Sequence, residues 1–236
     1  MDTDALIDRL AEEAAPVHRV RPVWVRVAWW FGLAIPPLVL AVAVHGVAGG
    51  AVGMMQDTRL LVEQAATLVT AVSAAAAAFA STVPGVNRRW LWLPVVPLAV
   101  WLLAIGKGCI DEWFHVGSEG LVVHADLGCF FPMLLVGAVP AAAMLIMVRR
   151  GAPLAPRSTL CLGALGIAAF VAFGLRFFHP GDASIMILVW HVGMVAVVML
   201  FGIFVSNPLT SWAFWAGIVV GVASIVGASV LLAPKR

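Results

Sequence analysis

The chain contains no tyrosine, and only 11% of its 236 residues are charged. The formal net charge of +2 is too small to predict direct binding to nucleic acid. The three cysteines form no CxxC pair, and no HExxH spacing indicates a zinc site. The stretch from Met1 to Pro16 is polar and acidic, so we expect no cleavable signal peptide. The chain is instead rich in apolar residues, which make up 63% of it.

Long apolar stretches make up most of the chain. Six lie at about 24–46, 60–83, 90–109, 121–148, 159–178 and 184–205, and a seventh lies at 211–233. Each is long enough to cross a hydrocarbon layer of roughly 30 Å as a helix. We therefore predict an all-α, polytopic transmembrane bundle with six core spans and a seventh C-terminal span. The predicted parts are a tail at 1–23, a membrane domain at 24–205 and an additional hydrophobic segment at 206–236.

Arginines are concentrated in the tail and in alternate connections between the segments. They are Arg9, Arg19, Arg21 and Arg26 in the tail, Arg88 and Arg89 after the second segment, and Arg149, Arg150 and Arg157 after the fourth. The other connections are acidic or mixed, and we assign to them Asp57, Arg59, Glu63, Lys107, Asp111, Glu112, Glu119, Asp126, Arg176 and Asp182. By the positive-inside rule, the tail and the arginine-rich connections are cytoplasmic.

Two further patterns concern the segment ends and the last segment. The tryptophans near segment ends, where an interfacial belt is expected, are Trp24, Trp29, Trp30, Trp90, Trp113 and Trp212. Gly217 and Gly221 form a GxxxG pair, which permits close packing against another helix and hence a homodimer.

The tail carries the pattern of a short amphipathic helix. Asp2 or Thr3 can cap a helix that begins at Asp4, and Pro16 stops it. The apolar stripe consists of Leu6, Ile7, Leu10 and Ala14, and the acidic face of Asp4, Asp8, Glu12 and Glu13 with Arg9 as its one cation. A helix lying on anionic lipid needs a basic polar face, so this one instead predicts a protein partner with a basic groove. A solvated helix without a partner is the alternative.

Cysteines and histidines gather in the predicted outer connections. Cys109 and Cys129 can form a disulfide if their Cα atoms come within about 4.4–6.8 Å. They can instead bind a metal ion together with His115, His124 or His179. They can also be ordinary packing and loop residues. His191, inside the sixth segment, favours an interhelical hydrogen bond over a ligand or proton-relay role. These residues therefore do not decide whether the chain binds a metal ion, or which one.

Two other classes of protein compete with a partner-binding regulator. A small-molecule transporter should place charged groups around a cavity at the membrane midplane, and the segment centres lack acids and bases. A membrane thiol or haem redox protein can use Cys109 with Cys129, or His124 with His191 as axial ligands.

Several motifs occur in an order that resembles a known family. They are TDALIDRLAEEAAPVHRVRP, VPGVNRRWLWLPVVPLAVW, GKGCIDEWFHVG, DLGCFF, RRGAPLAP and FHPGDASIMILVWH. Together, over residues 3–205, they resemble the NrsF family of membrane-embedded anti-sigma factors, which are negative regulators of bacterial extracytoplasmic-function sigma factors.

The resemblance implies an inner-membrane protein of about six spans with both ends inside, no catalytic activity and no cofactor. It implies that the tail binds the sigma factor through Asp4, Leu6, Ile7, Asp8, Leu10, Glu12 and Glu13. It also implies that the outer face responds to metal or oxidative stress, with Cys129 matching the family's cysteine. His179 stands where some members have a second cysteine, so either Cys109 takes that role or this chain senses by a different chemistry. The sensing candidates are Cys109, Cys129, His179 and His191.

Overall fold

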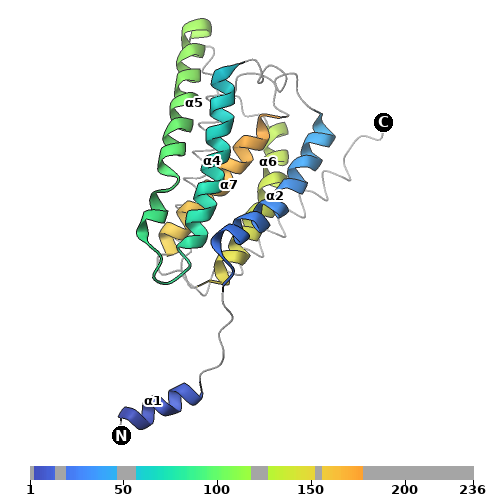
Figure 1. Cartoon of the computed structure of the whole chain (residues 1–236). Helices are drawn as coiled ribbons and strands as arrows, with labels where there is room; N and C mark the ends of the chain where they lie inside the picture. The colour runs from blue at the N-terminus through green and yellow to red at the C-terminus, as the bar shows by residue number, and fades with distance from the viewer. Residues whose placement is uncertain (1–2, 14–19, 47–56, 118–126, 152–155, 178–236) are drawn as a thin grey trace.

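The computed structural model describes residues 3–13, 20–46, 57–117, 127–151 and 156–177, where all regular structure is helical (Figure 1). The elements are α1 (Thr3–Glu12), α2 (Val23–His45), α4 (Thr58–Ala80), the 3-10 helix η1 (Arg88–Trp92), α5 (Val95–Val116), α6 (Leu127–Arg149) and α7 (Pro156–Leu175). The predicted segments 184–205 and 211–233 lie outside the described residues.

Four stretches in the described part are long and apolar enough to cross a membrane. They are Val23–Val44, Thr58–Ala80, Arg88–His115 and Pro156–Leu175, and α6 adds the shorter apolar stretch Val136–Arg149. The prediction of an apolar helical bundle is confirmed for this part of the chain. The count of six spans plus a seventh stays a prediction.

Successive long helices run in opposite directions, so the bundle has two ends. We call the end where α2, α5 and α7 begin the tail end, and the end where α4 and α6 begin the far end (Figure 1). Helix α4 packs against α7, α5 and α2, while α6 packs against α2 and α7. Helix α4 therefore lies at the centre of the described bundle.

Small residues allow α4 and α7 to approach closely. Ala74, Ala75, Ala76, Ala77 and Ala78 are all 0% exposed. A Cβ atom added to Gly166 of α7 would lie 3.2 Å from the backbone nitrogen of Ala75 and 3.4 Å from the carbonyl oxygen of Ala71. Backbone atoms move aside less readily than a flexible side chain, so a Cβ at position 166 would be tightly placed and the contact favours glycine.

An aromatic cluster joins α2 to α6 and α7 in the core. Trp30 is 0% exposed, and its indole Nε1–H donates to the carbonyl oxygen of Pro140 at 2.8 Å. Its ring centroid lies 4.9 Å from that of Phe31 and 5.9 Å from that of Phe170, both in edge-on geometry. These contacts anchor the first half of α2 to the bundle.

The prediction of an interfacial belt is wrong for Trp30, although the neighbouring Trp29 is 57% exposed. Consecutive residues on a helix point about 100° apart, so only one of the two rings can face the core. Trp24 and Trp113 are exposed as expected, and Trp24 lies 5.8 Å from the half-buried Trp90, measured between ring centroids. Trp212 lies outside the described residues.

Candidate functional site

Helix α1 carries an apolar stripe over which no described residue packs. Leu6, Ile7 and Leu10 are 39%, 56% and 59% exposed, and no residue of α1 is buried. Positions three and four apart share one face of a helix, so the three side chains form one surface. Figure 1 shows α1 away from the bundle. The predicted helix and its stripe are confirmed, while the binding of a partner stays a prediction.

The acidic side chains of the tail are also exposed. Asp4, Asp8 and Glu12 lie on α1, and Glu13 follows it, with its backbone N–H donating to the carbonyl oxygen of Arg9 at 3.0 Å. The predicted stop at Pro16 and the end of the stripe at Ala14 lie outside the described residues. Helix α1 therefore presents three aliphatic side chains beside a mainly acidic surface.

The tail end of the bundle contains a buried arginine, Arg26. We call this residue and the groups that it contacts the Arg26 hub. Its guanidinium donates to the carbonyl oxygen of Phe79 at 3.0 Å, to Thr82 Oγ1 at 2.9 Å and to the carbonyl oxygen of Met147 at 2.7 Å. Arg26 is 4% exposed, and its Cζ lies 4.6 Å from the centroid of the Phe79 ring. A cation is favourable there because helices end in unpaired carbonyls with a partial negative charge.

The hub corrects the prediction that Arg26 belongs to the tail as a topological charge. Arg26 lies in the first turn of α2, where it joins the C-terminal ends of α4 and α6. Nearby, Ser81 Oγ and Thr159 Oγ1 lie 2.7 Å apart and connect the end of α4 to the beginning of α7. Four helices are thus joined by polar contacts at the tail end.

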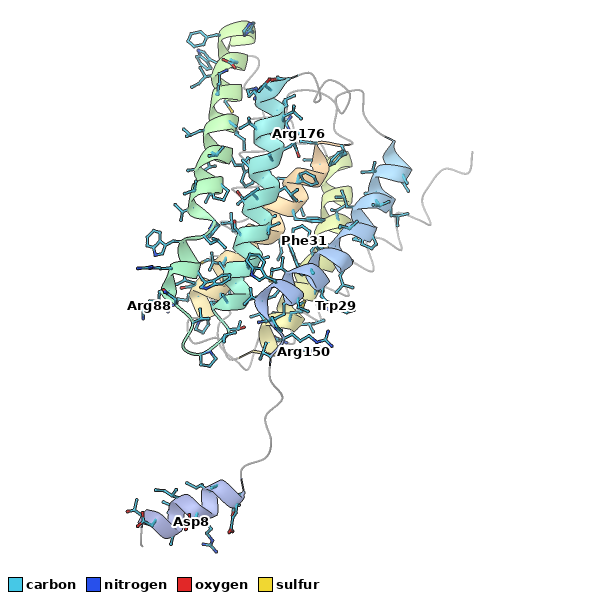
Figure 2. The ribbon with its side chains drawn as sticks, viewed as in Figure 1. Asp8, Trp29, Phe31, Arg88, Arg150 and Arg176 are labelled. Atoms are coloured by element: carbon cyan, nitrogen blue, oxygen red, sulfur yellow. The ribbon has the colours of Figure 1, made fainter. Side chains whose placement is uncertain are left out.

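Exposed arginines surround the same end of the bundle. They are Arg21 before α2, Arg88 and Arg89 in η1, Arg149 at the end of α6, Arg150 directly after it, and Arg157 in α7. Figure 2 shows Arg88 and Arg150 at this end, with Arg176 at the opposite one. The predicted grouping of the arginine-rich connections on one side is therefore confirmed. Arg9 lies on α1, outside the bundle, and Arg19 lies outside the described residues.

The far end contains a buried ion pair between α4 and the end of α7. Glu63 is 1% exposed and Arg176 is 8% exposed. Arg176 donates from Nη2 to Glu63 Oε1 at 2.6 Å and from Nε to the same oxygen at 3.3 Å. Arg59 Nη1 lies 3.8 Å from Glu63 Oε2 on the next turn of α4.

The assignment of Glu63 to an outer connection is wrong, whereas Arg176 does lie in the turn directly after α7, but buried against Glu63. Helix α4 begins at Thr58, because the Asp57 side chain accepts a hydrogen bond from the backbone N–H of Arg59 at 2.8 Å and so caps the helix. Glu63 then falls in the second turn, on the face that packs against α7. The predicted segment 60–83 already contained Glu63, and the capping pattern Asp-Thr at 57–58 was a further signal in the sequence that places it inside a helix.

The predicted sensing residues are only partly described. Helix α5 continues to Val116, so Cys109 lies two turns before its end and packs, partly buried, against the core. The prediction that this segment ends at Cys109 is wrong, because Lys107 and Asp111 pair at 3.9 Å and the carbonyl oxygen of Asp111 meets His115 Nδ1 at 2.7 Å along the helix.

The other sensing candidates lie wholly or partly outside the described residues. Cys129 lies in α6, but its side chain is outside the described set, as are His124, His179 and His191. Among the residues that are described, no three His, Cys, Asp or Glu side chains are grouped to hold a metal ion. The disulfide and the metal site stay predictions.

A family model described as NrsF, negative regulator of sigma F, matches residues 10–212 and thus most of the chain. The chain belongs to the NrsF family. This NrsF protein is therefore a negative regulator of a sigma factor, and a sigma factor is its partner. The resemblance inferred from the sequence is confirmed. No curated protein matches the chain, and no solved structure matches it.

The matched range does not coincide with the predicted one. It begins at Leu10 near the end of α1, so Leu6 and Ile7 precede it, and it ends at Trp212 in the predicted seventh segment. The Arg26 hub and the Glu63–Arg176 pair both lie inside the range that defines the family.

Proposed function

We propose that this NrsF protein is an integral membrane anti-sigma factor that sequesters an extracytoplasmic-function sigma factor through α1. The observation that carries the proposal is the exposed stripe of Leu6, Ile7 and Leu10 on a helix away from the bundle. Large aliphatic side chains held in water at helical spacing are typical of a helix that lays its apolar face into a groove of a partner.

The bundle supports a location in the bacterial inner membrane. Long apolar side chains are exposed around it, including Val39, Val44 and Leu103 at 59%, 70% and 74%. Lipid tails would cover such a surface. The exposed arginines at the tail end favour a cytoplasmic position for that end and for α1, the compartment in which a sigma factor is found.

Binding through α1 has sufficient driving force. Burying each of Leu6, Ile7 and Leu10 completely contributes roughly 1.5–3 kcal/mol before the cost of ordering the partners. The exposed carboxylates Asp4, Asp8 and Glu12 would complement a basic groove, which mainly accelerates association and selects the partner. The affinity therefore resides in the stripe, and the selectivity in the acids.

The test is capture of the partner by the tagged full-length protein. A variant with Leu6→Ala, Ile7→Ala and Leu10→Ala keeps the helix propensity and the charges of α1 but removes its anchors. We expect its affinity for the captured sigma factor to fall about 100-fold or more. Ala5→Ser with Ala11→Ser, on the same exposed helix, is the matched control and should bind as the wild type does.

Retained binding by the three-alanine variant would place the contact on the arginine-bearing end of the bundle and contradict the role of α1. Failure of the wild type to capture a sigma factor from cells that contain one would contradict direct sequestration.

We further propose that release follows a metal or oxidative signal at the far end, sensed by Cys109 and Cys129 with His179 and His191. Thiols in an oxidising compartment are the groups in this chain most readily changed by either stimulus. Cys109→Ser with Cys129→Ser is expected to abolish induction of a sigma-dependent reporter by oxidants and by metals. Cys161→Ser, in α7, is the control. Unchanged induction in the double variant would show that the trigger does not use these thiols.

A further inference from the structure

Helix α4 has one buried ionic or charge-assisted contact near each of its ends. In its second turn, Glu63 pairs with Arg176 at the end of α7. At its last turn, the carbonyl oxygen of Phe79 and the hydroxyl of Thr82 accept from Arg26 of α2. Figure 2 shows Arg176 at the end of the bundle opposite Arg88 and Arg150. One continuous helix thus connects the far-end pair to the Arg26 hub.

The stretch of α4 between these contacts consists mainly of small side chains and of hydroxyl groups that form hydrogen bonds within the helix. The buried hydroxyls of Thr67 and Thr70 donate to the carbonyl oxygens of Glu63 and Ala66 at 2.6 and 2.7 Å, within the helix itself. The following alanine run has no long side chains to interlock with α7. The close contact of this run with Gly166 and the polar contacts near the helix ends together set the axial position of α4 against α7, and only the polar contacts depend on charge.

The far-end pair is incompletely satisfied. Glu63 is the one buried acidic side chain among the described residues, and its Oε2 has no hydrogen bond within that part of the chain. The side-chain oxygen of the adjacent Gln64, which is 6% exposed, has none there either. A buried polar network that is only partly satisfied is less costly to rearrange than one in which every group is bonded.

We propose that the Glu63–Arg176 contact is a latch that holds α4 against α7 in the position at which Arg26 docks on the end of α4. Opening the latch at the far end shifts α4, loosens the Arg26 hub and changes how α2 presents the tail, so that the sigma factor is released. This regulation rests on the proposed function of α1. It requires two packings of the bundle that differ in their affinity for the partner.

The Arg26 hub is suited to report a movement of α4. Its guanidinium contacts the ends of α4 and α6 at once, with distances of 3.0, 2.9 and 2.7 Å. Hydrogen bonds weaken steeply outside this range, so a shift of about 1 Å breaks some of them. Arg26 lies in the first turn of α2, and this helix directly follows the described residues Val20, Arg21 and Pro22 of the tail.

The test uses the full-length protein and the sigma factor that the wild type captures. Glu63→Gln keeps the shape of the side chain and removes its charge, and Arg176→Gln replaces its partner by a shorter, uncharged side chain directly after α7. We expect each to lower the captured amount about tenfold at equal protein levels in the membrane, a size usual for coupling between distant sites. The swapped variant, Glu63→Arg with Arg176→Glu, should recover part of the loss. Asp111→Asn, a half-exposed acid near the end of α5 that pairs with Lys107, should capture normally.

A variant of reduced stability separates release from general unfolding. Val136→Ala shortens a side chain that is 1% exposed in α6 and leaves both polar contacts intact. It should lower the thermal midpoint while capturing as the wild type does. Equal loss of capture in Val136→Ala and Glu63→Gln at matched midpoints would overturn the latch, as would normal capture by Glu63→Gln or no recovery in the swapped variant. Loss of capture in the three-alanine α1 variant alone would keep the proposed function while the latch fails. No capture by the wild type would contradict both.

Discussion

Replacing Trp30 by alanine should lower the free energy of unfolding of the bundle by about 3–5 kcal/mol. The indole is fully buried, packs edge-on against Phe31 and Phe170, and donates to the carbonyl oxygen of Pro140. Alanine would leave a cavity among α2, α6 and α7 and remove the indole hydrogen bond. The measurement is the thermal midpoint of the detergent-solubilised protein, followed by the loss of its monodisperse peak in size-exclusion chromatography.

Trp29→Ala provides the matched control one position earlier in the chain. Trp29 is 57% exposed, and its ring centroid lies 5.9 Å from Cζ of Arg21. An exposed cation–π contact of this kind contributes about 0.5–1 kcal/mol, so the midpoint should change little. Equal losses in the two variants would contradict the placement of Trp30 in the core.

Arg26→Ala should be about as destabilising, at roughly 3–5 kcal/mol. Each hydrogen bond from a charged donor contributes about 1.5–3 kcal/mol, and the three contacts of Arg26 are not fully additive. The change would leave the carbonyl oxygens of Phe79 and Met147 without this donor at a buried junction of three helices. The same thermal measurement tests it.

Two further variants separate the geometry of the guanidinium from its charge. Arg26→Lys keeps the charge but cannot reach three acceptors with a rigid planar group, so we expect a partial loss. Arg21→Ala removes an exposed arginine five positions earlier and should shift the midpoint little. A midpoint for Arg26→Ala equal to that of Arg21→Ala would show that the hub does not stabilise the fold.

Hydropathy and spacing were sufficient to predict the elements that depend on local sequence. The apolar segments at 24–46, 60–83 and 159–178 correspond closely to α2, α4 and α7, because a run of about 20 apolar residues has few alternatives to a helix. Helix α1 was predicted from three aliphatic positions and an N-terminal cap, both of which are local signals.

The buried charges could not be predicted in this way. Glu63 and Arg176 are 113 residues apart, and each stands near the end of an apolar stretch, where a charge is normally taken as part of a connection. Only the packing of α4 on α7 brings them together. Arg26 was counted among the tail arginines for the same reason, since two of its three acceptors are backbone carbonyls, which leave no trace in the sequence of side chains. Trp29 and Trp30 differ only in the direction in which each points from α2. The sequence does not show which of these directions faces the other helices.

The separation of Glu63 from Arg176 also bears on how the protein is made. A chain that is synthesised from its N-terminus presents α4 long before α7, because 113 residues lie between the two partners. During that interval, the cation nearest along α4 is Arg59, one turn earlier and 3.8 Å from Glu63 in the finished fold. The hydroxyls of Thr67 and Thr70 need no such interim partner, since they bond within α4. Packing of α7 against α4 is therefore the folding step that completes the neutralisation of Glu63, which ties assembly of the bundle to synthesis of α7.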